Sequence, residues 1–138
     1  MIKIDRHTVI QILGSLMNKP ELMSDVDRYI IEVGDFPNTL DKLIFSAINN
    51  LYNDGDGANK IKTVDIINYL NDNQVAKNLI EKENGETFIK DCEMNSEPAN
   101  FNHYYNRLKK LNLLKDLEKT GRDITEFYCE DILNPNYV

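Results

Sequence analysis

The sequence predicts an all-α protein, a small orthogonal bundle of about six helices followed by a long C-terminal helix. Three observations carry this prediction. Apolar residues recur at helical spacing in one segment after another, no segment alternates apolar and polar residues as a half-buried strand does, and clusters of turn-forming residues separate the segments. The 138 residues suit one domain, and 41% of them are hydrophobic, which is enough for a modest core.

The first helix is predicted over residues 9–17. Its apolar residues recur at the spacing of one helical face: Val9, Ile12, Leu13, Leu16 and Met17. Gly14 lies at the edge of this stripe, where a glycine costs about 1 kcal/mol relative to alanine. We therefore expect another backbone to pack closely against Gly14.

Two further helices are predicted before residue 54. Pro20 is compatible with the first turn of a helix that Gly34 stops, with the stripe Leu22, Met23, Val26, Tyr29 and Ile30. Thr39 is a candidate cap for the next helix, which has the clearest stripe of the chain: Leu40, Leu43, Ile44, Ala47, Ile48 and Leu51. The turn formers of residues 53–59 end it.

Three short helices complete the predicted head. The first starts near Thr63 and carries Val64, Ile66, Ile67 and Leu70. The second carries Val75 and Leu79 and ends at Asn84-Gly85, and the third carries Phe88, Ile89 and Cys92. Residues 95–100 are expected to form a loop.

A long helix is predicted from residue 102 to residue 130, where proline is absent and Gly121 is the only glycine. Its apolar stripe contains Tyr104, Leu108, Leu111, Leu114, Leu117, Ile124 and Phe127 or Tyr128. At 1.5 Å per residue such a helix reaches about 40 Å. We therefore divide the chain into a helical head, residues 1–100, and a long helix with the start of a linker, residues 101–138.

This long stripe predicts a protein–protein contact. The head helices can cover only part of it, and soluble monomers rarely leave a large apolar patch in water. We expect it to contact a second copy of the chain or another protein, through the candidates Tyr104, Leu108, Leu111, Leu114 and Leu117.

Basic residues occupy the other sides of the same helix: Arg107, Lys109, Lys110, Lys115, Lys119 and Arg122. They form either a solvated face or a docking face for an acidic partner or nucleic acid, for which the candidates are Arg107, Lys110, Lys115 and Lys119. No aromatic platform accompanies them, which argues against stacking of single-stranded bases. The net charge of −7 also argues against broad binding of a phosphate backbone, so direct nucleic-acid binding is expected to be weak or absent.

No catalytic, metal or cofactor site is predicted. The stretch DGDGAN resembles the start of a calcium loop, but Ala58 and Asn59 stand where such a loop needs an oxygen ligand and a glycine. The two histidines lack ligand partners, and no glycine-rich phosphate loop is present. Cys92 and Cys129 are expected to be reduced, buried or half-buried thiols. Without a membrane span or secretory signal, a cytoplasmic protein is expected.

The order of these motifs resembles the N-terminal domain of DnaB-type replicative DNA helicases. The matching stretches are ILGSLMNKPELM at residues 12–23, Asp35-Phe36, the Leu-Ile-Phe-x-Ala-Ile-x-x-Leu run of residues 43–51, Gly85 with Phe88-Ile89, and residues 97–117. The sequence departs from the family pattern at Val9, at Thr39-Leu40-Asp41 and at Asn84. These departures favour a divergent phage or mobile-element version.

The resemblance implies an all-helical head followed by the first arm of a helical hairpin. In this family the domain forms a collar by pairing subunits in the helicase hexamer, and it docks the C-terminal domain of the primase. The motor that uses ATP and Mg²⁺ follows on the same chain, so the sequence is expected to be part of a longer helicase. A stand-alone adaptor or decoy from a mobile element, binding host primase or helicase, is the alternative. An all-helical enzyme is a third reading, which a metal or nucleotide held by converging carboxylates would support.

Overall fold

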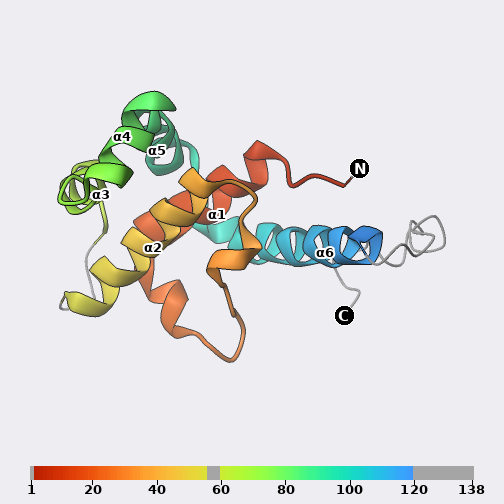
Figure 1. Ribbon diagram of the computed structural model, residues 1–138. Helices are drawn as coiled ribbons and strands as arrows, with labels where there is room; N and C mark the ends of the chain where they lie inside the picture. Colours follow the sequence, from red (N-terminus) through yellow and green to blue (C-terminus); the bar gives the residue numbers. More distant parts are fainter. Residues whose placement is uncertain (1, 56–59, 120–138) are drawn as a thin grey trace.

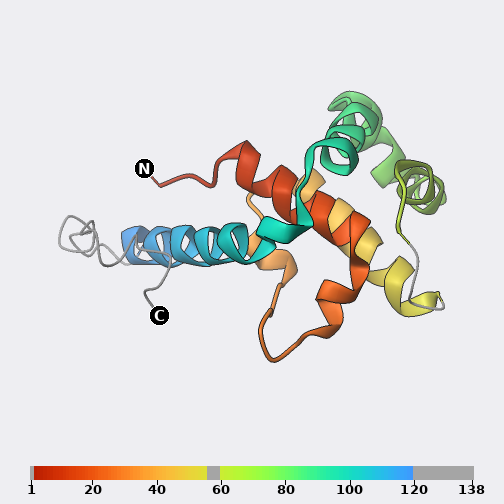
Figure 2. The same cartoon turned by 180° about the vertical axis from the view of Figure 1, so that it is seen from behind.

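The computed structural model describes residues 2–55 and 60–119 (Figure 1). Within these ranges it contains no strand, which confirms the all-α prediction. The α-helices are α1 (Arg6–Asn18), α2 (Thr39–Asp54), α3 (Thr63–Leu70), α4 (Gln74–Lys82), α5 (Gly85–Asn95) and α6 (Phe101–Lys119). The first five form a head, and α6 projects from it as a rod, as both faces of the molecule show (Figures 1 and 2).

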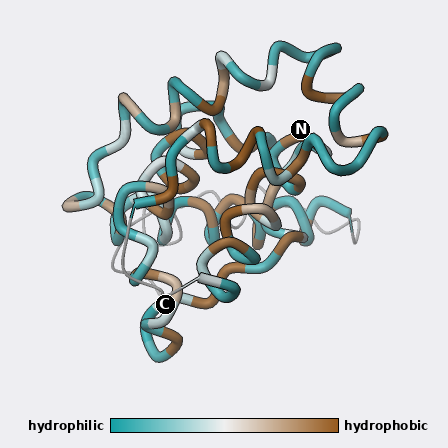
Figure 3. Tube along the Cα trace, turned by 90° about the vertical axis from the view of Figure 1, so that its left-hand side faces the viewer, coloured by the Kyte–Doolittle hydropathy of each residue, from teal (hydrophilic) through white to brown (hydrophobic). Residues whose placement is uncertain are grey.

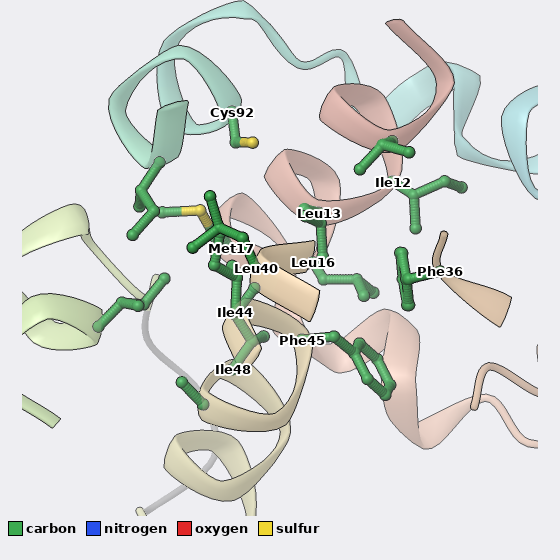
Figure 4. Close-up of a cluster of buried hydrophobic side chains, with 14 of the residues drawn as sticks. Ile12, Leu13, Leu16, Met17, Phe36, Leu40, Ile44, Phe45, Ile48 and Cys92 are labelled. Carbon is green, nitrogen blue, oxygen red and sulfur yellow. The ribbon is translucent and has the colours of Figure 1, made fainter. Parts of the chain in front are cut away.

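The centre of the head is α1. It begins after Asp5, whose carboxylate accepts a hydrogen bond from the Thr8 amide at 3.0 Å. Helices α2, α5 and α6 all pack against it. The core that they enclose includes Ile12, Leu13, Leu16, Met17, Phe36, Leu40, Ile44, Phe45, Ile48 and Cys92 (Figure 4). Hydrophobic and hydrophilic stretches are interspersed along each helix, as expected when a helix buries one face (Figure 3).

The backbone of α5 packs closely against Gly14 of α1, which confirms the sequence prediction. A Cβ atom on Gly14 would lie 1.9 Å from the Cys92 carbonyl oxygen and 2.5 Å from the Cβ atom of Ser96. The thiol of Cys92 is fully buried, and this burial raises its pKa to about 12. Cys92 is therefore a neutral core thiol, and Cys129 lies outside the described residues.

The prediction of a helix from Pro20 to Gly34 is wrong. Only a 3₁₀ turn, Pro20–Ser24, forms there, and a second one follows at Val33–Asp35. Beyond the first turn, Tyr29 packs edge-on against Phe101, with ring centroids 4.7 Å apart. This contact with α6 holds residues 28–32 outside any helix, so a tertiary contact overrides the local spacing.

The other boundaries agree closely with the sequence. Thr39 is the first helical residue of α2, whereas Asn38 occupies the cap position. Asn84 adopts a left-handed conformation, φ 54°, which separates α4 from α5. The expected loop at 95–100 contains a 3₁₀ turn, Pro98–Asn100, which leads directly into α6. The predicted part of the long helix after Lys119 lies outside the described residues.

Candidate protein–protein interface

The first turns of α6 are anchored by an aromatic cluster. Phe101 is buried, and Tyr29 also meets Tyr105 edge-on with ring centroids 4.9 Å apart. The Ile30 amide donates a hydrogen bond to the Tyr105 hydroxyl at 3.0 Å. The segment that the sequence predicted as a helix therefore fixes the base of α6.

The N-terminal arm, residues 2–5, holds one flank of α6 (Figure 1). The Ile2 amide donates to a Glu118 carboxylate oxygen at 2.8 Å, and Arg107 Nε donates to Asp5 Oδ1 at 3.0 Å. Burial alone would raise the pKa of Asp5, but hydrogen bonds from Thr8 and Arg107 outweigh burial and lower it. The arm thus contacts α6 at two places, Arg107 and Glu118.

The opposite flank of α6 is tied to the 3₁₀ turn Val33–Asp35. Lys109 Nζ lies 2.8 Å from Asp35 Oδ2, and the Asn112 side-chain amide donates to the Asp35 carbonyl at 3.0 Å. Contacts on both flanks fix the direction in which α6 leaves the head.

The five predicted contact residues do not share one side of α6. Leu108 is fully buried in the core of the head and Leu114 is also fully buried, whereas Tyr104, Leu111 and Leu117 are partly exposed. The spacing spreads the five residues around the helix axis. Each three-residue step turns the side chain back by about 60° around the helix axis. The steps from Leu108 to Leu117 therefore add up to about half a turn, so Leu117 lies on the side of α6 opposite Leu108.

The predicted basic residues are also divided among different environments. Arg107 is paired with Asp5, and Lys110 Nζ is shielded from solvent without a hydrogen-bond partner among the described residues. Lys115 and Lys119 line a recess beside the N-terminal arm. The role of these residues in docking stays a prediction, as does the contact role of the apolar set.

Two features of this region were not found by sequence reasoning. One is the exposed apolar surface of the mispredicted segment, where Val26 is 64% and Ile30 is 59% exposed. The other is a bidentate ion pair between Arg6 and the fully buried Asp41, at 2.7 and 2.8 Å. In the sequence, only the charged residue Asp41 beside the strongest apolar stripe indicates such a pair. Its partner Arg6 cannot be predicted, because it lies in another helix, α1.

The chain belongs to the family of DnaB-like helicase N-terminal domains, whose model matches residues 9–120. It is also similar to a prophage protein of Bacillus subtilis (strain 168), named "SPbeta prophage-derived uncharacterized protein YorI". The two are 31% identical over 131 residues, which cover 95% of this chain and 26% of that protein. The chain therefore spans about a quarter of the length of this relative, and the match fits a divergent phage version of the domain.

No solved structure matches the chain. None of the helices in the described ranges is long and apolar enough to cross a membrane.

Proposed function

We propose that this chain is the collar domain of a replicative DNA helicase, in which copies pair through α6 and dock the C-terminal domain of the primase. Membership of the helicase N-terminal domain family carries the proposal. The structure supports it because α6 projects from the head and keeps apolar surface accessible, with Leu113 46% exposed. In the working hexamer, ATP and Mg²⁺ would be used by a separate motor domain, and the protein would act in the cytoplasm.

The pairing mechanism is non-covalent burial of apolar area on α6. Each Å² of apolar surface removed from water contributes about 25 cal/mol, and the loss of free motion on association offsets much of this gain. Because one helix face offers limited area, we expect the isolated chain to associate at roughly tens of micromolar rather than tightly.

Light scattering of the chain, alone and with a primase C-terminal domain, tests both parts of the proposal. Alone, the chain should exceed the 16.0 kDa mass of a monomer at high concentration. The Leu113→Asp variant, checked for its fold by circular dichroism, should shift toward the monomer because a charge then lies on the exposed apolar surface of α6. A monomeric chain that the variant leaves unchanged would contradict pairing, and an unchanged mass with primase would contradict docking.

A stand-alone adaptor or decoy that binds host primase or helicase is the second candidate, favoured by the prophage origin of the similar protein. The reading frame separates the two candidates. A motor domain encoded after Val138 supports the collar, whereas a stop codon there supports the adaptor.

A further inference from the structure

A recess of about 530 Å³ lies between the N-terminal arm, the start of α2 and the end of α6. Ile2, Ile4 and Pro37 contribute apolar surface to it. Ile4 is buried and the other two are half-buried. Such a surface can receive one apolar side chain of a partner.

The recess concentrates positive charge in an otherwise acidic chain. Its lining includes the cationic residues Lys3, Arg6, Lys115 and Lys119. Glu118 also lines the recess and accepts a hydrogen bond from the Ile2 amide, and the buried carboxylate of Asp41 is paired with Arg6. The three lysines form no ion pair within the described part of the chain. An excess of cations therefore faces solvent here, although the net charge of the chain is −7.

The start of α2 adds to this positive field. Asn38, which lines the recess, is the cap residue of α2, and its side chain makes no capping hydrogen bond. The N-terminus of a helix carries a partial positive charge from its unpaired amides. Helix α2 thus reinforces the lysines rather than opposing them.

We propose that this recess binds an acidic segment of a partner protein. The carboxylates of the segment pair with Lys3, Lys115 and Lys119, and an apolar side chain packs on Ile4. Charge complementarity selects an anionic partner. The described lining residues include no aromatic side chain on which bases could stack, which favours a protein segment over single-stranded nucleic acid. This inference does not depend on pairing through α6.

A labelled peptide of alternating glutamate and leucine is the probe, and fluorescence anisotropy with the whole chain measures its affinity. The double variant Lys115→Glu/Lys119→Glu should bind it at least about tenfold more weakly, because like charges then face each other. The double variant Lys77→Glu/Lys82→Glu makes a control for net charge, since both lysines are exposed on α4 away from the recess. It should change the affinity less than about twofold. Circular dichroism confirms that each variant is folded.

Two further probes make the experiment decisive. A glutamine–leucine peptide should bind much more weakly than the glutamate–leucine peptide, and raised salt should weaken binding of the acidic one. Undetectable binding, equal binding of both peptides, or equal weakening by Lys77→Glu/Lys82→Glu would overturn the proposal. Tighter, recess-dependent binding of a thymidine oligonucleotide would overturn it in favour of nucleic acid. None of these results alters the mass of the free chain, so the test is separate from that of the collar.

Discussion

Gly14 sets the distance between α1 and α5, since its hydrogen-only side chain lets the Cys92 carbonyl approach. Gly14→Ala would place a methyl group 1.9 Å from that oxygen. The two backbones must then separate. We expect the variant to lower the free energy of unfolding by about 2 kcal/mol, which outweighs the gain in helix propensity of about 1 kcal/mol. Urea denaturation measures the change.

Gly34→Ala is the matched control, because nothing lies within 4 Å of a Cβ added there. Its free energy of unfolding should stay within about 0.5 kcal/mol of the wild type. Equal stability of the two variants would show that α1 and α5 are not in the close contact described.

The ion pair of Arg6 and Asp41 is unequal, because Asp41 is fully buried whereas the Arg6 side chain is 45% exposed. Arg6→Met keeps a side chain of similar length but removes the guanidinium, which lies over the Phe88 ring, and leaves the Asp41 charge buried without a cation. We expect it to cost about 3 kcal/mol of unfolding free energy. Asp41→Asn should cost less, since Arg6 can then turn toward water. Thermal and urea unfolding compare them, and the reverse order would contradict this account of the pair.

At the scale of elements, α3 and α5 are joined by a titratable contact. Hydrogen bonds from the Thr63 hydroxyl at 2.6 Å and the Thr63 amide at 2.9 Å lower the pKa of Glu93 below its ordinary value of 4.5. A carboxylate whose folded-state pKa is lowered stabilises the fold above its unfolded-state pKa. This stabilisation is lost as the pH falls through the folded-state value.

Glu93→Gln should therefore weaken the pH dependence of the melting temperature below a pH of about 4.5. Above that pH the variant should melt at a lower temperature than the wild type, and the two curves should converge on acidification. Glu81→Gln, at an exposed position on α4, is the control and should leave the slope close to that of the wild type. Parallel curves for Glu93→Gln and the wild type would contradict the Thr63–Glu93 contact.

Most helices could be predicted from the sequence because each buries its own stripe. The stripe of α2 places Leu40, Ile44 and Ile48 in the core, as the spacing predicts. The segment after Pro20 could not be predicted, since the partner of Tyr29 is an aromatic cluster more than seventy residues away in α6. Local spacing contains no information about such a contact.

The candidate interface on α6 was predictable only in part. The sequence identifies the apolar residues, but three-residue steps carry them around the helix axis, so Leu108 joins the head while Leu117 lies on the other side. The recess could not be predicted at all. Lys3 and Lys115 are more than a hundred positions apart in the sequence, and only the folded arm brings them together.

At the scale of the whole molecule, α6 projects from the head, and the central claim is that α6 pairs with a second copy. Leu113 is 46% exposed on α6, so Leu113→Asp should remove the contact without disturbing the core. Met94 is 80% exposed on α5, and Met94→Asp adds the same charge to the head.

Sedimentation velocity over a range of concentrations compares these two variants with the wild type. Pairing through α6 predicts that the wild type and Met94→Asp associate alike at roughly tens of micromolar, whereas Leu113→Asp remains monomeric. A wild-type chain that stays monomeric throughout, or a Leu113→Asp variant that associates as the wild type does, would contradict it.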